Sequence, residues 1–231
     1  MLAAFLFLHI VLMVFWLGGD LGVFYSSRYV IDPSLTPAAR LTALKIMSGL
    51  DLGPKICLIL FLPSGLTLIS LDAHGGSLFG IHLLPWWLLV PLWIGALVWV
   101  RLMHVDHHAP GQHPLVRRID RLIRIAVITG MAATGVYTLI ATHPFGVDTN
   151  PKWLGGKVLL YALAIAAGLG IRRTLRPFGA AFSKIMAGGT DDATEAVLKQ
   201  SVNGCLPYVW VIWLSVLLAG LLGVAKPLAN L

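Results

Sequence analysis

Two side chains that could hold a metal or move protons, His9 and Asp20, share one face of the first apolar stretch with Trp16, whose flat ring could lie beside a porphyrin. An α-helix turns by about 100° per residue, so His9 and Asp20 lie within roughly 20° of each other around its axis. Ionisable groups are costly inside a lipid bilayer, and they usually mark functional sites there. An imidazole can bind haem iron, whereas a histidine that only hydrogen-bonds a neighbouring helix is the alternative.

A lysine and a second histidine are expected near the depth of His9, on other segments. His9 lies roughly 9 Å inside the first apolar stretch, and Lys157 lies roughly 6 Å inside the fifth. The two side chains are therefore expected to face each other across the bundle. His143, at the end of the fourth stretch, is a further nitrogen donor near this end. A lysine whose amine extends to the lipid head groups is the alternative for Lys157.

A separate polar group is expected towards the opposite end of the bundle, and it contains Asp20, Tyr25, Arg28, Asp51, Lys55 and Asn203, of which Asn203 is a candidate cofactor-binding residue. Asp20 could relay protons to a buried site, while Arg28 and Tyr25 could hold an anionic substrate or a haem propionate. These three are the candidate catalytic residues. The alternatives are a helix-packing role for Asp20 and anchoring at lipid head groups for the other two.

The segment His104-Val-Asp-His107-His108 is a second group of metal-binding side chains. His-x-x-His-His boxes also occur in membrane di-iron enzymes, where several such boxes surround two metals, and this chain has one. His104 and His108 face the same side if the helix continues to residue 108. The outer His74 and His82 lie on the wrong side to complete the box. The histidine box at residues 104–108 therefore predicts a site for one additional metal ion; the alternative is a solvated helix end.

The elements that position these side chains are predicted to be transmembrane helices. Of the 231 residues, 58% are hydrophobic and 12% are charged, whereas soluble domains are about 25% charged. A helix needs about 20 apolar residues to cross the bilayer. Six such spans are expected, at approximately 3–25, 54–72, 85–103, 122–142, 153–171 and 205–225. The prediction is a single all-α domain over residues 1–231, an integral membrane helical bundle.

The positive residues predict how the bundle is oriented. Fourteen of the 17 Lys and Arg fall in the stretches 26–55, 101–124 and 172–199, whereas 73–84 and 143–151 contain none. Short loops rich in Lys and Arg stay on the cytoplasmic side. Both termini are therefore expected outside, in a multi-pass protein of the cell inner (plasma) membrane. The net charge of +7 belongs to loops beside anionic lipid, so no nucleic-acid partner is expected.

Two segments between the spans are expected to be amphipathic helices along the inner leaflet. Thr36 can cap a helix that begins at Pro37, and Thr190 with Asp191 can begin a second helix that ends near Asn203.

Three stretches of the chain resemble a known family of haem b membrane proteins, the J-type protoporphyrinogen IX oxidases. The string His9-Ile-Val-Leu-Met-Val-Phe-Trp16-Leu-Gly-Gly19, followed by Phe24-Tyr25 and Arg28, resembles the opening of that family. Trp153-Leu-Gly-Gly-Lys157 is similar to the start of one of its helices. Asn203-Gly-Cys-Leu-Pro207 is similar to its Asn-Glu-x-Pro segment, with Gly204 in place of Glu. The tryptophan-glycine signature is shared with copper-resistance D-like membrane proteins.

The resemblance implies that His9 is an axial haem ligand and that Lys157 is a second ligand or an essential partner. The expected function is that of a b-type haem protein in electron transfer or oxidation of a small substrate, such as protoporphyrinogen IX. The group opposite His9 would be Lys157 or His143. Expected partners are membrane lipid, a quinone or redox protein, and further copies of the chain in a homo-oligomer. Transport of copper or another metal ion is the main alternative, and a di-iron enzyme is the third.

Overall fold

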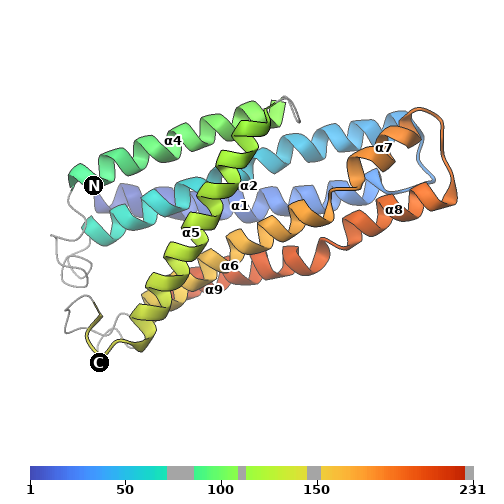
Figure 1. Ribbon diagram of the computed structural model, residues 1–231. Coiled ribbons are helices and arrows are strands. Elements are labelled where there is room, and N and C mark those ends of the chain that lie inside the picture. The colour runs from blue at the N-terminus through green and yellow to red at the C-terminus, as the bar shows by residue number, and fades with distance from the viewer. Residues whose placement is uncertain (72–85, 109–112, 145–151, 227–231) are drawn as a thin grey trace.

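The computed structural model describes residues 1–71, 86–108, 113–144 and 152–226, and the regular elements in these ranges are all helices (Figure 1). Six helical segments are long and apolar enough to cross a membrane. The predicted fold class, an all-α multi-pass membrane bundle, is therefore confirmed. His74 and His82 lie outside the described residues.

The described helices are α1 (Leu2–Val30), α2 (Pro37–Leu71), α4 (Trp86–His108), α5 (Pro114–Ile140), α6 (Lys152–Thr174), α7 (Phe178–Met186), α8 (Asp192–Asn203) and α9 (Leu206–Ala225). Several of them extend beyond the predicted spans. The sixth candidate span runs through α8 and α9. Helix α5 begins eight residues before its predicted span, and α7 has no predicted counterpart.

Helix α2 joins the first predicted amphipathic helix and the second predicted span into one helix of 35 residues. Its beginning is as predicted, because the Ala39 backbone N–H donates to the Thr36 hydroxyl oxygen at 3.3 Å. Pro54 would normally end or kink a helix, since proline lacks a backbone donor. Here a Cβ on Gly19 of α1 would lie 2.7 Å from the Pro54 ring carbons. The Pro54 ring thus packs against Gly19, which has no side chain, and α2 continues without a break through Pro54.

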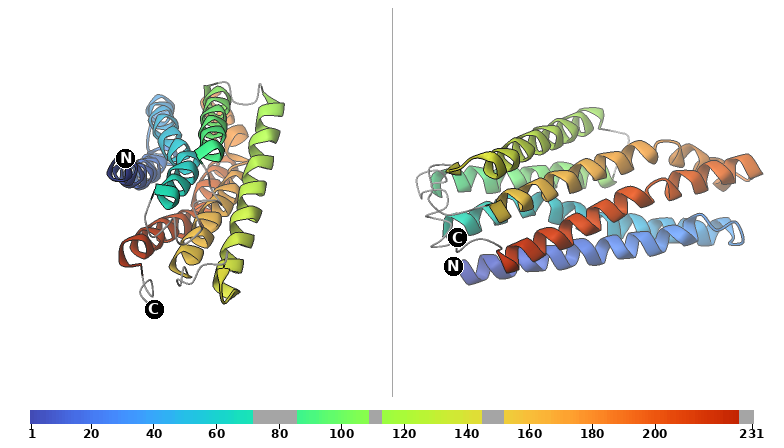
Figure 2. Two further views of the ribbon diagram at one scale, coloured as in Figure 1. Left: turned by 90° about the vertical axis from the view of Figure 1, so that its left-hand side faces the viewer. Right: turned by 90° about the horizontal axis from the view of Figure 1, so that it is seen from below.

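Helices α1, α2, α4, α6 and α9 run along the bundle and α5 crosses it obliquely, with both described chain ends at one end (Figures 1 and 2). Helix α1 packs along α2, and α6 packs along both α5 and α9. Helix α4 contacts α2 and α5. We call the end that holds Met1 and Lys226 the terminal end. The opposite end, where α7 and α8 lie, is called the cap end.

The cap end has an apolar core of its own. Val30, Ile185 and Leu198 are fully buried there, together with Phe182, and the first turns of α2 pack against them. Helix α8 begins as predicted, because Asp191 accepts a hydrogen bond from the Thr194 backbone N–H at 2.6 Å. Its apolar side packs on α7 and on the ends of α1 and α2, so these helices form one packed unit.

An ion pair ties this unit together. Arg40 of α2 is 2% exposed and donates from both terminal nitrogens to the Glu195 carboxylate of α8, at 2.7 and 2.9 Å. Its Nε donates to the Val30 carbonyl at the end of α1, at 2.9 Å. One guanidinium therefore connects three helices.

Candidate functional site

A cavity of about 360 Å³ lies between α1, α2, α6 and α9 in the terminal half of the bundle. Its size is within the range of about 300–1,000 Å³ that is common for small-molecule sites. Most of the residues that line it are apolar. His9, Trp16, Lys157 and Tyr161 are among the polar or aromatic exceptions. Three residues singled out from the sequence, His9, Trp16 and Lys157, therefore meet at one cavity.

The His9 ring is held by a hydrogen bond from α1 to α2. Its Nδ1 lies 2.8 Å from the Ser64 hydroxyl oxygen, and Ser64 itself is fully buried. The Ser64 hydroxyl donates its single hydrogen to the Phe61 carbonyl at 3.1 Å. When that hydrogen points to the Phe61 carbonyl, the Ser64 oxygen accepts from His9, and this arrangement has the ring proton on Nδ1. The lone pair is left on Nε2, the nitrogen that can bind a metal.

Aromatic side chains form the wall beside His9. The Phe61 ring centroid lies 4.3 Å from that of His9, and Trp16 meets Phe61 edge-on at 5.4 Å. A Cβ on Gly65 would lie 3.5 Å from His9 Cε1. The absence of a side chain at Gly65 therefore keeps space open at the edge of the imidazole.

Two lysines line the same cavity. Lys157 of α6 lies close enough to His9 for its charge to act on the ring. A Cβ on Gly223 would lie 2.7 Å from Lys157 Nζ, so the glycine of α9 makes room for the amine. Lys226 was not singled out in the sequence; its Nζ lies 5.7 Å from the centroid of the Trp153 ring. The signal that could have identified it is its position just after the last apolar segment, at the same end of the bundle as Lys157.

The candidate catalytic residues do not join this cavity. Asp20 is partly buried between α1 and α2, where it interacts with Trp16, Asp51 and Lys55. Tyr25 is 60% exposed, towards the cap end. Asp20 therefore lies nearest to the cavity, next to Trp16 in its lining.

The remaining predicted groups are exposed and lie apart. The exposed Arg28 guanidinium lies over the Phe24 ring, 4.7 Å from its centroid. Asn203 is exposed at the end of α8, and His143 is exposed just after α5. Of the two groups predicted opposite His9, the structure brings Lys157 to the cavity and leaves His143 at the surface.

The histidine box lies on α4, which continues to residue 108 as the shared face of His104 and His108 requires. Both His104 and His107 are partly buried. Within the described ranges, no three His, Cys, Asp or Glu side chains are grouped closely enough to hold a metal ion. The prediction of an additional metal here gains no support from that part of the chain.

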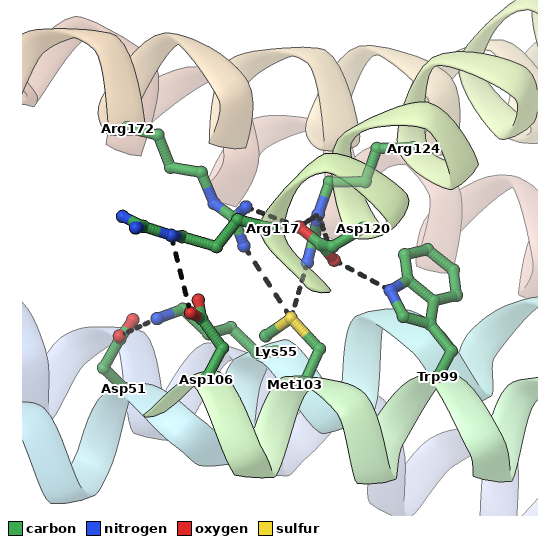
Figure 3. A network of polar contacts seen from close by, with 9 residues as sticks. All are labelled: Asp51, Lys55, Trp99, Met103, Asp106, Arg117, Asp120, Arg124 and Arg172. Carbon is green, nitrogen blue, oxygen red and sulfur yellow. Dashed lines mark hydrogen bonds and ion pairs between the residues drawn. The ribbon is translucent and has the colours of Figure 1, made fainter. Parts of the chain in front are cut away.

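A buried charged network on α4, α5 and α6 was not predicted from the sequence (Figure 3). Asp120 and Arg124 are each 3% exposed, and Arg124 Nε donates to both Asp120 oxygens at 3.1 Å. Arg172 donates to Asp120 at 2.5 Å, and the Trp99 indole donates to it at 2.8 Å. In the sequence, Arg124 falls both in the positive stretch 101–124 and in the predicted span 122–142; α5 begins at Pro114 and buries Arg124. Its four-residue spacing from Asp120 was the available signal.

Tyr161 lies between this network and the cavity. Its ring lines the cavity, and its hydroxyl donates to the Leu58 carbonyl of α2 at 2.7 Å. The Tyr161 side chain is also near enough to Arg124 for an electrostatic interaction. The cavity and the charged network are therefore neighbouring regions of one bundle.

Comparisons of this chain with protein-family models, with curated proteins and with solved structures give no match.

Proposed function

We propose that the chain is an integral membrane b-type haem protein, with His9 Nε2 as an iron ligand in the cavity between α1, α2, α6 and α9. Its function would be electron transfer or the oxidation of a small substrate. The family resemblance of the His9-to-Gly19 string makes protoporphyrinogen IX the first substrate to test. Electrons would pass to a quinone or to a redox partner protein.

The observation that carries the proposal is the hydrogen bond between His9 and Ser64. Histidines that bind metals usually donate their other ring N–H to a neighbouring acceptor, which fixes the tautomer and the ring orientation. His9 has this arrangement with an uncharged, fully buried serine. Its Nε2 makes no hydrogen bond to a described residue, and the residue lines a cavity of ligand size.

The lining of the cavity also suits a flat, apolar group that carries acidic substituents. Phe61 and Trp16 offer aromatic surface beside the imidazole. Lys157 and Lys226 supply positive charge, which would pair with haem propionates. Haem, when bound, would supply one-electron redox chemistry, and the axial ligand would tune its potential.

Lys157 has two available roles in this proposal, because a neutral amine can bind iron and a charged one can bind a carboxylate. Either role requires the side chain to remain inside the cavity, where Gly223 gives it room. The alternative, an amine extended to the lipid head groups, is less consistent with this position.

We further propose that the cap end faces the cytoplasm and that both termini lie outside, in the inner membrane. The stretches 26–55 and 172–199, rich in Lys and Arg, include the α1–α2 connection, α7 and α8, all at the cap end. The positive-inside tendency supports this orientation.

The test is the haem content of His9→Ala, purified in detergent after expression with added haem. We expect His9→Ala to lose bound haem, whereas the control His143→Ala, at an exposed position, should retain it. A His9→Ala protein with the haem content and spectrum of the parent protein would overturn the proposed ligand.

A further inference from the structure

The charged network of Asp120, Arg124 and Arg172 has more positive charge than its own carboxylate can balance. Asp120 carries one negative charge, and both guanidinium groups donate to it (Figure 3). Arginine stays protonated in proteins, so neither cation can be removed by titration. Arg124 is buried and paired with Asp120, so the unbalanced positive charge lies at Arg172, whose side chain is 38% exposed and within reach of an anion from outside. The network therefore favours the arrival of one more anionic group.

The donors of the two arginines converge at the side chain of Met103. Arg124 Nη2 lies 3.4 Å from the Met103 sulfur, and Arg172 Nη2 lies 3.8 Å from it. A thioether is a weak acceptor, whereas a phosphate or carboxylate oxygen forms strong, charge-assisted bonds with guanidinium. Methionine is also flexible enough to move aside. Met103 thus occupies the position that an anionic oxygen would fill.

The charged side chains at the border of the network are partly exposed to the surroundings of the bundle. The Arg172 side chain is 38% exposed, and that of Arg117 is 48% exposed. Asp106 pairs with Arg117 at 3.7 Å, and Lys55 pairs with Asp51 nearby (Figure 3). The Arg117–Asp106 and Lys55–Asp51 pairs are each neutral, so the unbalanced positive charge belongs to the group of Asp120, Arg124 and Arg172.

Asp106 adds a requirement for a hydrogen-bond donor on the ligand. Its Oδ1 atom is buried and has no hydrogen-bond partner among the described residues; the nearest cation is Arg117, whose Nε lies 3.7 Å from this atom, beyond hydrogen-bond distance. Asp106 lies three residues after Met103, on the same face of α4. A ligand with an anionic oxygen at the arginines and a hydroxyl group close by would satisfy both.

We infer that Arg124 and Arg172 bind the phosphate of a glycerol phosphate group, with Asp106 accepting a hydrogen bond from its hydroxyl. The source of this group is an anionic phospholipid such as phosphatidylglycerol, or a soluble phosphate ester. Basic pockets between transmembrane helices bind anionic lipid head groups in the same way. None of these residues lines the cavity around His9, so the site stands independently of the haem proposal.

The experiment compares lipid binding to the purified full chain by native mass spectrometry. We expect phosphatidylglycerol to bind in preference to phosphatidylcholine, and Arg172→Gln to weaken that binding by about tenfold or more, equivalent to about 1.4 kcal/mol. Arg173→Gln is the matched control, because Arg173 is exposed at the next position of the same helix. It should bind the anionic lipid as the parent does.

A second arm separates the two sources of phosphate. If glycerol 3-phosphate displaces phosphatidylglycerol, the site accepts a soluble ester; if it does not, the site is specific for lipid. Both results support the inferred chemistry. Equal binding of the two lipids, or an Arg172→Gln protein that binds phosphatidylglycerol like the parent, would overturn it.

Met103→Leu keeps the test decisive if Arg172→Gln fails to fold. This change conserves volume and removes the sulfur that competes for the arginine donors. We expect Met103→Leu to bind phosphatidylglycerol at least as tightly as the parent protein. A loss of binding in this variant would contradict the displacement of Met103 by the ligand.

Discussion

His9 Nδ1 of α1 lies 2.8 Å from the Ser64 hydroxyl oxygen of α2, and Ser64 in turn donates to the Phe61 carbonyl. This chain of two hydrogen bonds favours the tautomer with the proton on Nδ1. It also joins the two helices that pack most extensively against each other. The orientation of a candidate iron ligand therefore depends on one serine of the neighbouring helix.

Replacement of Ser64 by Ala should weaken haem binding without removing the ligand itself. The His9 ring would lose the acceptor that sets its tautomer, and comparable losses around metal ligands cost about 10–100-fold in affinity. Haem titration of the purified variant measures the effect. Ser70→Ala is the control, because the Ser70 hydroxyl donates to the Leu66 carbonyl of its own helix. Equal affinities for Ser64→Ala and the parent protein would rule out this role for Ser64.

Lys157→Ala should change the haem spectrum or reduce haem content, since it removes a cation that lines the cavity. A shift of the absorption bands at full haem content would indicate a ligand, whereas reduced affinity with unshifted bands would indicate a propionate partner. Lys152→Ala, at an exposed position five residues earlier in α6, is the control. If Lys157→Ala has the spectrum and affinity of the parent, Lys157 has no part in the site.

Much of the fold could be predicted from the sequence, because apolar segments of membrane length are the strongest signal that a chain carries. The limits of α2 and α5 could not. Pro54 predicts a helix boundary locally, and its contact with Gly19 is between residues far apart in the chain. Arg124 lies where a positive stretch and a predicted span overlap, and the sequence alone does not show that it is buried against Asp120.

Part of the site was predictable, because spacing within one segment shows which side chains share a helix face. His9 and Trp16 share one helix face, so their proximity follows from spacing alone. Lys157 could be placed by its depth in another segment. The contributions of Ser64 and Gly65 depend on the register between α1 and α2, which spacing within one segment does not determine.

Glu195→Ala should destabilise the cap end. Arg40 would remain buried without its carboxylate partner, and breaking a buried ion pair in this way costs about 3–5 kcal/mol. We expect a lower thermal unfolding temperature in detergent and faster proteolysis near α8. Lys199→Ala, at an exposed position on the same helix, is the control and should behave like the parent. Unchanged stability of Glu195→Ala would show that the ion pair contributes little.

The beginning of α8 should loosen in acid. The hydrogen bond from Lys184, together with those from Thr194, holds the pKa of the Asp191 carboxyl below its ordinary value of 3.8. A lowered folded-state pKa contributes stability above the ordinary pKa, and this contribution is lost as pH falls through the lowered value. Hydrogen exchange at residues 192–195 should therefore accelerate from pH 5 towards pH 3 beyond the intrinsic change in exchange rate.

Asp191→Asn is the informative variant for this effect, because asparagine caps helices comparably but does not titrate. The additional acceleration should disappear in Asp191→Asn. It should persist in Asp192→Asn, which keeps the Asp191 contact with Lys184. An identical pH response in all three proteins would show that Asp191 is not responsible.

The reduced-minus-oxidised visible spectrum of the parent protein, with haem quantified per chain, tests the central claim most directly. After purification from cells supplied with haem, we expect b-type absorption bands and a stoichiometric haem content. A folded, colourless protein that takes up no haem on titration would contradict the proposed function.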